Sequence, residues 1–172
     1  GTWMKVRNTF IIFIVSGLWH GANWTFIVWG LLNALYIMPS IISKTNRDNI
    51  EIVAKGKMLP SFKDVIAIIT TFCLTVLAWI FFRAENLSHA INYIENIFSY
   101  SIFSLPAIIP KTLLITLLIF IIIEWFGREN EYAIEKFSIK IPRIIRWGFY
   151  YLIVGSILYF AGSEQQFIYF QF

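Results

Sequence analysis

His20 is the residue of this chain whose type and position most clearly offer chemistry. It lies within residues 9–43, a block that carries no formal charge when the imidazole is neutral, and an ionisable group in so apolar a stretch is a candidate for function. Burial favours the neutral imidazole, which can take a proton from a hydroxyl and so serve as a general base. The competing interpretation is an interhelical hydrogen bond that only packs two helices, and spacing alone does not separate the two.

Polar and aromatic side chains surround this histidine at close spacing. On a helix, Ser16 lies one turn before His20 and Trp24 one turn after it, and Asn23 follows at three residues. Trp19 precedes the histidine directly. The tryptophans can equally be interface anchors or packing residues, so the residues alone indicate a possible site and no more.

The charge-free block is too long for a single upright membrane span, so it must break, tilt strongly or re-enter. A continuous helix of this length would measure about 50 Å, well above the ~30 Å hydrocarbon core. We expect a break between Gly17 and Gly21, with the histidine at the joint, which leaves helical segments at residues 9–18 and 22–38 or one kinked helix. The two glycines also form a small-xxx-small pair that allows another helix or a substrate chain to approach closely. Pro39 is expected to end the second segment.

The composition places the chain in a lipid environment. Hydrophobic residues make up 58% of its 172 residues and charged residues 14%, against roughly 45–50% and about 25% in an ordinary soluble domain. A soluble domain of this size cannot hide so many apolar side chains. Intrinsic disorder, a disulfide-stapled module and a soluble nucleotide-binding fold are therefore excluded. The single cysteine, Cys73, also leaves no internal disulfide or cysteine metal site.

Three further apolar blocks have the length and composition of membrane-spanning helices. Between the first two, residues 87–98 place apolar side chains at helical spacing, which predicts an amphipathic helix in the membrane interface. The predicted fold is all-α and polytopic, one membrane domain over residues 1–172 with about four to five membrane segments. These are a broken or re-entrant segment at 9–42 and spanning helices at 65–82, 112–126 and 147–161.

Lysine and arginine side chains gather in two loops, residues 44–64 and 128–146. Such loops are typical of the cytoplasmic side, so we expect both to face the cytoplasm and the amphipathic helix and the C-terminus to face outward. Lys5 and Arg7 place the N-terminal end inside as well, which requires an even number of crossings in the first block. The net charge of +4 is explained by this topology without a nucleic-acid partner. The chain is therefore predicted to be a multi-pass protein of the cytoplasmic (inner) membrane.

Several motifs extend along the whole chain. They are Arg-Asn-Thr-Phe at 7–10, the segment 16–26 with its Trp-His-Gly-Ala-Asn-Trp run, Trp-Gly at 29–30, and the segments 78–84, 124–128 and 167–170. Together they resemble the membrane-bound O-acyltransferase (MBOAT) family. The resemblance is strongest to the bacterial branch of alginate O-acetyltransferases and D-alanyl-lipoteichoic-acid transferases, and it fits the C-terminal part of such a protein. Because the Trp-His-Gly-Ala-Asn-Trp run is long and unusual, the resemblance is specific.

The resemblance implies that His20 is the catalytic residue, because it occupies the position of the family's essential histidine. It implies a tunnel in which an acyl thioester from the cytoplasm, acetyl-CoA or an acyl-carrier protein, meets a hydroxyl acceptor from outside, with no metal and no permanently bound cofactor. His20 would take the hydroxyl proton as the oxygen attacks the thioester carbonyl. The tetrahedral intermediate needs hydrogen-bond donors, for which Asn23 and the indoles of Trp24 and Trp19 are the nearest candidates, with Ser16 as a further polar neighbour.

The resulting hypothesis is an O-acyltransferase of the lipid bilayer that acts on an extracytoplasmic polysaccharide, alone or with a partner acyltransferase. Acetyl is the first choice of acyl group, and D-alanyl transfer to teichoic acid is the second. A non-enzymatic transport or scaffold subunit is the alternative from another class, although the Trp-His-Gly block has no second copy of the kind that repeats in transporters. Many family members also use a second polar residue upstream of the histidine, outside this chain, so the chain alone is expected to be inactive.

Two residues near the predicted amphipathic helix receive lesser roles. Arg83 is expected to end the preceding span and to extend its guanidinium to the interface, with the orientation of an anionic donor as the weaker alternative. His89 lies on the amphipathic helix itself and is expected to be solvated.

Overall fold

The computed structural model describes residues 1–46, 48, 50–104, 108–135 and 141–162. Within these residues every regular element is helical and none is a strand, which confirms the predicted all-α class for the described part of the chain. Two compact units are present, Gly1–Pro106 and Ala107–Phe172, and each is considered by itself.

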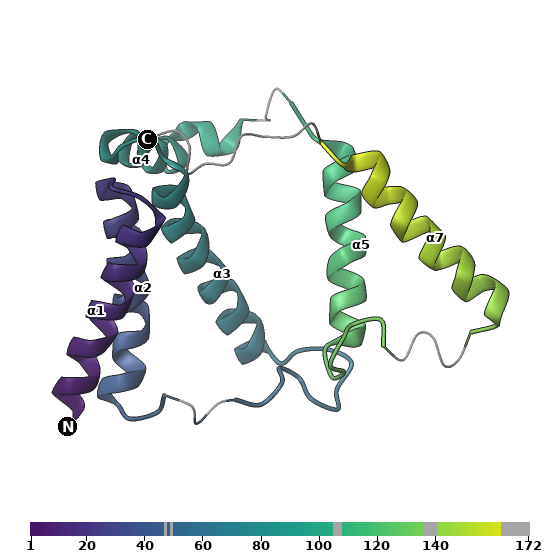
Figure 1. Ribbon diagram of the computed structural model, residues 1–172, viewed down its shortest axis with the longest axis horizontal. Coiled ribbons are helices and arrows are strands. Elements are labelled where there is room, and N and C mark those ends of the chain that lie inside the picture. The colour runs from purple at the N-terminus through teal and green to yellow at the C-terminus, as the bar shows by residue number, and fades with distance from the viewer. Residues whose placement is uncertain (47, 49, 105–107, 136–140, 163–172) are drawn as a thin grey trace. The chain divides into compact units, whose positions relative to one another are not determined.

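The helices follow one another along the chain in the order shown by the colours of Figure 1. The first unit contains α1 (Thr2–His20), α2 (Trp24–Ile42), α3 (Phe62–Arg83), α4 (Leu87–Ile97) and the short 3-10 helix η1 (Tyr100–Phe103), and the second contains α5 (Lys111–Gly127) and α7 (Arg143–Phe160).

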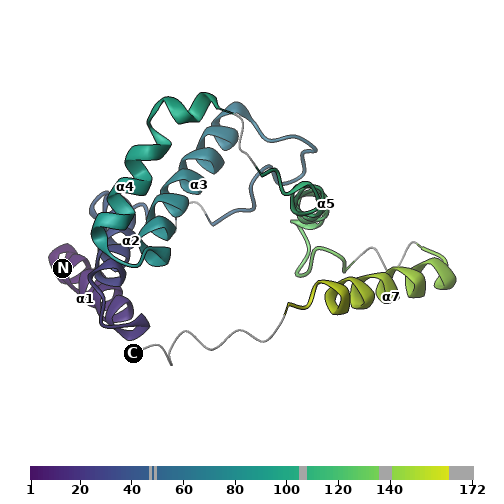
Figure 2. The same cartoon turned by 90° about the horizontal axis from the view of Figure 1, so that it is seen from above.

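The first unit begins with a helical hairpin, in which α1 and α2 lie side by side in both views (Figures 1 and 2). Glycines allow the two backbones to touch. A Cβ atom at Gly17 would collide with the Phe26 carbonyl, and a Cβ atom at Gly30 would collide with the Phe13 carbonyl. Small residues of this kind permit close helix packing in lipid. The helix that approaches Gly17 is therefore the next one in the same chain.

The hairpin turns at Gly21, directly after the last residue of α1. Its φ of 151° lies in the region that favours glycine. The side chain of Asn23 caps α2 by accepting a hydrogen bond from the Thr25 backbone N–H at 3.1 Å. The predicted break is thus in the right place, but α1 is longer than residues 9–18 at both ends. Its first two turns contain Lys5 and Arg7 and are still helical because lysine and arginine are good helix formers.

The second helix of the hairpin continues through Pro39 to Ile42, so the prediction that Pro39 ends it is wrong. A proline inside a helix removes one backbone donor, but here less than one further turn follows. Hydroxyl groups satisfy carbonyls at this end. The Oγ of Ser40 donates to the Ile37 carbonyl, and the Oγ of Ser43 donates to the Pro39 carbonyl, both at 2.8 Å. The donor that Pro39 lacks is the one to the Leu35 carbonyl, and neither hydroxyl replaces it.

Side-chain caps define where α3 and α4 begin. Ser61 and Asp64 form a reciprocal capping box at the start of α3. Asn86 caps α4 by accepting a hydrogen bond from the His89 backbone N–H at 2.9 Å. Between them, Arg83 is the last residue of α3, as the sequence predicts. The connector between the two helices is therefore only a few residues long.

The other predicted helices agree with the observed ones in position. Residues 65–82 fall within α3 and 112–126 within α5, while 87–98 correspond to α4 and 147–161 largely to α7. Among the described residues, two helices, α2 and α3, are long and apolar enough to cross a membrane. The total of four to five membrane segments, and their assignment to a single domain, stay predictions.

The second unit contains α5 and α7, whose side chains are exposed along most of both helices. The chain after α5 folds back closely, because a Cβ atom at Gly127 would collide with the backbone of Ala133. The guanidinium carbon of Arg128 lies 4.2 Å from the ring centroid of Trp125, which is a cation–π contact at the C-terminal end of α5. The aromatic motif at 167–170 lies outside the described residues.

Candidate active site

His20 is the last residue of α1, and it is half-buried. Aromatic rings from three helices surround its imidazole. The ring centroid of Phe82 lies 5.1 Å away, that of Trp19 5.2 Å, that of Trp29 5.4 Å and that of Phe26 6.3 Å. These five side chains are called the His20 cluster below. Three of the rings meet the imidazole edge to face, a favourable geometry that restrains its orientation.

Phe82 links α3 to the hairpin within this cluster. Its ring centroid also lies 5.1 Å from that of Phe26 and 5.2 Å from that of Trp29, both on α2. Trp79 on α3 contacts Phe82 at 5.0 Å. One turn before Phe82, Ala78 is only 1% exposed, so a small side chain allows α3 to approach here. The C-terminal end of α3 is therefore the part of that helix that forms the site.

Asn23 connects the hairpin turn to the connector between α3 and α4. Its Nδ2 donates a hydrogen bond to the Glu85 backbone carbonyl at 2.8 Å, while its Oδ1 caps α2 at Thr25. Both functional groups of the amide are therefore used in holding two parts of the fold together. Its predicted role as a donor to an oxyanion stays a prediction.

The remaining predicted site residues lie at different distances from the imidazole. Trp19 contacts the His20 ring and is 73% exposed, and Trp24 is 69% exposed as the first residue of α2. Ser16 is half-buried on α1, one turn before His20. The structure thus brings Trp19 directly against the histidine and leaves both indoles open to a ligand or to another part of the protein.

Sequence reasoning missed the contributions of Phe82 and Trp29 to the surroundings of His20. Both residues belong to motifs that carry the family resemblance, at 78–84 and 29–30, so a signal for their importance is present. Nothing in the spacing indicates that a residue 62 positions away contacts the imidazole. That contact depends on how α3 packs against the hairpin.

Two buried hydroxyls have no hydrogen-bond partner among the residues that the structure describes. They are the Oγ1 of Thr25, whose side chain is fully buried, and the hydroxyl of Tyr36. A buried unsatisfied hydroxyl is costly. Thr25 stands out because it belongs to the first turn of α2, directly beside the Asn23 cap. The unpaired Thr25 hydroxyl therefore lies in the first turn of α2, beside the candidate site.

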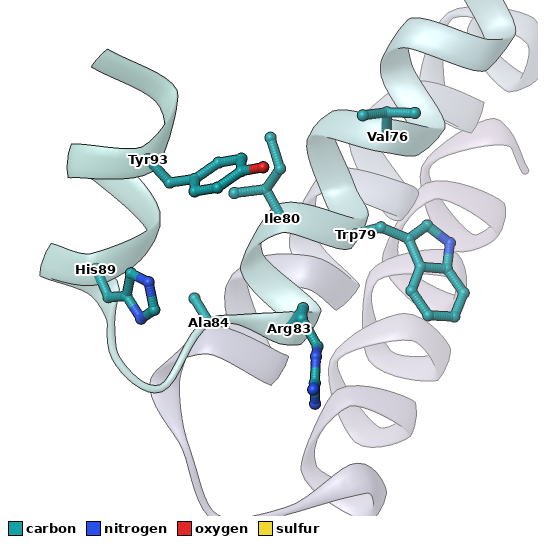
Figure 3. Close-up of a pocket in the computed structure, with 7 residues that line it drawn as sticks. All are labelled: Val76, Trp79, Ile80, Arg83, Ala84, His89 and Tyr93. Atoms are coloured by element: carbon teal, nitrogen blue, oxygen red, sulfur yellow. The ribbon is translucent and has the colours of Figure 1, made fainter. Parts of the chain in front are cut away.

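A hollow of about 330 Å³ lies between the end of α3 and α4 (Figure 3). His89 and Tyr93 extend from α4 toward α3 in this view, whereas the indole of Trp79 points away from them. Trp79, one of its lining residues, also contacts Phe82 of the His20 cluster. His89 is exposed in this structure, and its contact with solvent stays a prediction. The lining residues are Val76, Trp79, Ile80, Arg83, Ala84, His89 and Tyr93.

The part of the chain that forms the His20 cluster matches a known family. The model of MBOAT, the membrane-bound O-acyltransferase family, matches residues 2–82, which include every side chain of the cluster. The chain belongs to the membrane-bound O-acyltransferase family. Its two long apolar helices agree with this assignment, and the resemblance read from the Trp-His-Gly-Ala-Asn-Trp run is confirmed.

Curated relatives of this MBOAT chain include three bacterial proteins. It is 30% identical over 147 residues to the probable alginate O-acetylase AlgI of Pseudomonas aeruginosa, which covers 83% of this chain and 26% of that protein. It is 35% identical over 91 residues to a peptidoglycan O-acetyltransferase of Helicobacter pylori, covering 52% of this chain and 16% of that protein. For the probable alginate O-acetylase AlgI of Azotobacter vinelandii the identity is 32% over 137 residues, covering 77% and 25%.

The chain thus spans about a quarter or less of the length of these relatives. No solved structure matches it.

Proposed function

We propose that this MBOAT protein is an O-acetyltransferase of the cytoplasmic membrane, with His20 as its general base. It moves an acetyl group from a thioester donor to a hydroxyl of an extracytoplasmic polysaccharide. The observation that carries the proposal is the half-buried imidazole of His20, held by rings from three helices inside the segment that matches the family. Acetyl is favoured over D-alanyl because the relatives are alginate O-acetylases and a peptidoglycan O-acetyltransferase by name.

The proposed reaction needs one group that moves a proton in both directions. A neutral ring nitrogen of His20 takes the proton of the acceptor hydroxyl while its oxygen attacks the thioester carbonyl. The tetrahedral intermediate then collapses, the carbon–sulfur bond breaks, and the imidazolium returns the proton to the departing thiolate. The products are an O-acetyl ester and a free thiol, so atoms and protons balance.

The tetrahedral intermediate carries a negative oxygen that requires hydrogen-bond donors. The indole N–H groups of Trp19 and Trp24 are the best candidates in this chain, because both side chains are largely exposed beside the hairpin turn. Asn23 is less suited to this role because its amide already donates to the Glu85 carbonyl. Ser16 remains a further polar neighbour of the histidine.

The orientation of the hairpin in the membrane bears on which acetyl donor can reach His20. Lys5 and Lys44 line a common hollow at one end of the hairpin, and His20 lies at the other end. If the lysine end faces the cytoplasm, the imidazole lies about 22 Å further along α1, at 1.5 Å per residue, toward the side where a glycan arrives. A cytoplasmic acetyl group then has to be carried on a long flexible arm. Thioesters of coenzyme A or of an acyl-carrier protein have such an arm.

The proposal is tested by restoring the intact protein to cells that lack it and measuring ester-linked acetyl on the envelope polysaccharide. General bases contribute about 10²- to 10⁴-fold to rate, so H20A and H20Q are expected to reduce acetylation at least about a hundredfold. Equal amounts of each protein in the membrane fraction are the control. Normal acetylation by H20Q would remove His20 from the reaction, and an ester-linked D-alanine in place of acetyl would reassign the acyl group. If H20Q reduced transport of the envelope polysaccharide but left the amount of every ester unchanged, the non-enzymatic transport or scaffold alternative would be favoured.

A further inference from the structure

The hydrogen bond from Asn23 to Glu85 joins the two chain segments that carry His20 and Phe82, the ring closest to its imidazole. Asn23 follows His20 by three residues, and Glu85 follows Phe82 by three residues. The imidazole of His20 and the ring of Phe82 lie 5.1 Å apart, centroid to centroid. One hydrogen bond of 2.8 Å thus connects the hairpin turn to the end of α3 immediately beside this contact.

The orientation of the Asn23 amide is fixed by its two partners. The Thr25 backbone N–H can only donate, so it must meet the amide oxygen, and the Glu85 carbonyl can only accept, so it must meet the amide nitrogen. An exchange of oxygen and nitrogen would break both bonds. The amide is therefore matched to both partners at once, whereas an N-cap requires only the oxygen.

Contacts between rings also join the end of α3 to the hairpin. Such contacts are favourable at centroid separations of about 4.5–7 Å, and the rings of Phe26 and Trp29 both meet that of Phe82 edge to face, at 68° and 65°. A hydrogen bond is more restrictive, because it weakens steeply when its angle or length departs from the optimum. The Asn23 bond is thus a directional contact that restricts where the end of α3 lies relative to the turn.

We infer that Asn23 is a positioning residue, which fixes the imidazole of His20 against Phe82 by tying the hairpin turn to the α3–α4 connector at the Glu85 carbonyl. This inference rests on the proposed function of His20. Displacement of a reacting group by about 1 Å can cost up to a hundredfold in rate. Loss of the bond is therefore expected to affect the chemical step and to leave donor binding unchanged.

The test compares two substitutions that keep the cap of α2 and remove the bond to Glu85. In the intact protein, N23S and N23D retain a side-chain oxygen suited to an N-cap but lack the amide donor. We expect kcat for thioester-dependent transfer to fall about tenfold to a hundredfold, with KM for the donor unchanged. N23D is expected to lose more, because a carboxylate oxygen then faces the carbonyl oxygen.

Asn86 provides the matched control. It caps α4 from the same connector through the His89 backbone N–H, so N86S makes the same chemical change at a cap that does not reach the hairpin. N86S is expected to keep kcat within about twofold. N23S loses one hydrogen bond more than N86S, so its thermal unfolding midpoint is expected to be the lower of the two. The values of kcat are therefore compared well below both midpoints, where a difference reports position rather than unfolding.

Each outcome decides the inference. Wild-type kcat in both Asn23 variants would overturn it, as would a rise in KM alone. Failure of both variants to fold would make the bond a folding contact and overturn the positioning role. In the H20Q background, N23S is expected to cause no further loss of residual transfer, whereas a further loss would mean that Asn23 acts directly on the reacting atoms. If H20Q itself is fully active, the proposed function fails, independently of any effect at Asn23.

Discussion

The two histidines of the first unit occupy opposite environments. His20 is half-buried at the end of α1 among four aromatic rings. His89 is exposed in the first turn of α4, at the rim of an open hollow. The two imidazoles share the same chemistry, so the difference lies in how the fold restrains them. A general base has to be held in a fixed direction toward its substrate, and of the two only His20 is held by packing from several helices.

The largest effect is expected when the helices that restrain His20 are forced apart. A Cβ atom at Gly30 would collide with the Phe13 carbonyl, so G30L is expected to force α1 and α2 apart. Overpacking costs about 1–3 kcal/mol, and a clash with backbone lies at or above the upper end of that range. The measurement is the amount of folded protein in detergent and its thermal midpoint.

Gly155 on α7 supplies the control for this prediction. A Cβ atom there meets nothing within 4 Å among the described residues, so G155L is expected to leave the yield and the midpoint nearly unchanged. If G30L folds as well as G155L, the close hairpin is not required for the fold.

A smaller effect is expected when the fold is kept and one ring of the His20 cluster is removed. F82A leaves the hairpin intact but removes the ring that contacts the imidazole most closely, so kcat for acyl transfer is expected to fall about tenfold. Phe72, on the same helix, is 66% exposed, and F72A should change kcat less than twofold. Equal kcat values for the two variants would show that the restraint from α3 is not needed.

The smallest effect is expected at the second histidine. His89 is exposed and lies outside the His20 cluster, so H89Q is expected to keep transfer within about twofold of wild type, with the same KM for the donor. A transferase assay on membranes that contain equal amounts of each protein is sufficient. A tenfold loss of transfer in H89Q would indicate that the reaction takes place at the hollow beside α4 rather than at the His20 cluster.

The sequence predicts the elements of this structure better than it predicts their contacts. The apolar blocks locate α3 and α5, and the glycines around His20 locate the hairpin turn, because these features depend on local composition and backbone freedom. Pro39 does not end α2 as the sequence predicts, because it removes only the donor to the Leu35 carbonyl, and the helix continues past it to Ile42. A rule that treats proline as a stop does not contain this tolerance of one missing bond near a helix end.

The candidate site is predictable only in part for the same reason. His20, Trp19 and Asn23 are adjacent in the sequence, so a local motif is enough to select them. The positions of Phe82 and of the Glu85 carbonyl beside them depend on packing between α3 and the hairpin across 62 residues of chain. Spacing along the chain carries no information about such a contact, and the motif at 78–84 indicates only that the segment is distinctive.

The most direct test of the central claim, that His20 is the general base, is the pH dependence of kcat for acyl transfer by the purified intact protein in lipid vesicles. A general base works only when it is neutral. The wild-type kcat is therefore expected to rise with pH along a single limb and then level off, while H20Q lacks this limb and is at least about a hundredfold slower. An H20Q enzyme with the wild-type rate and the same limb would contradict the account.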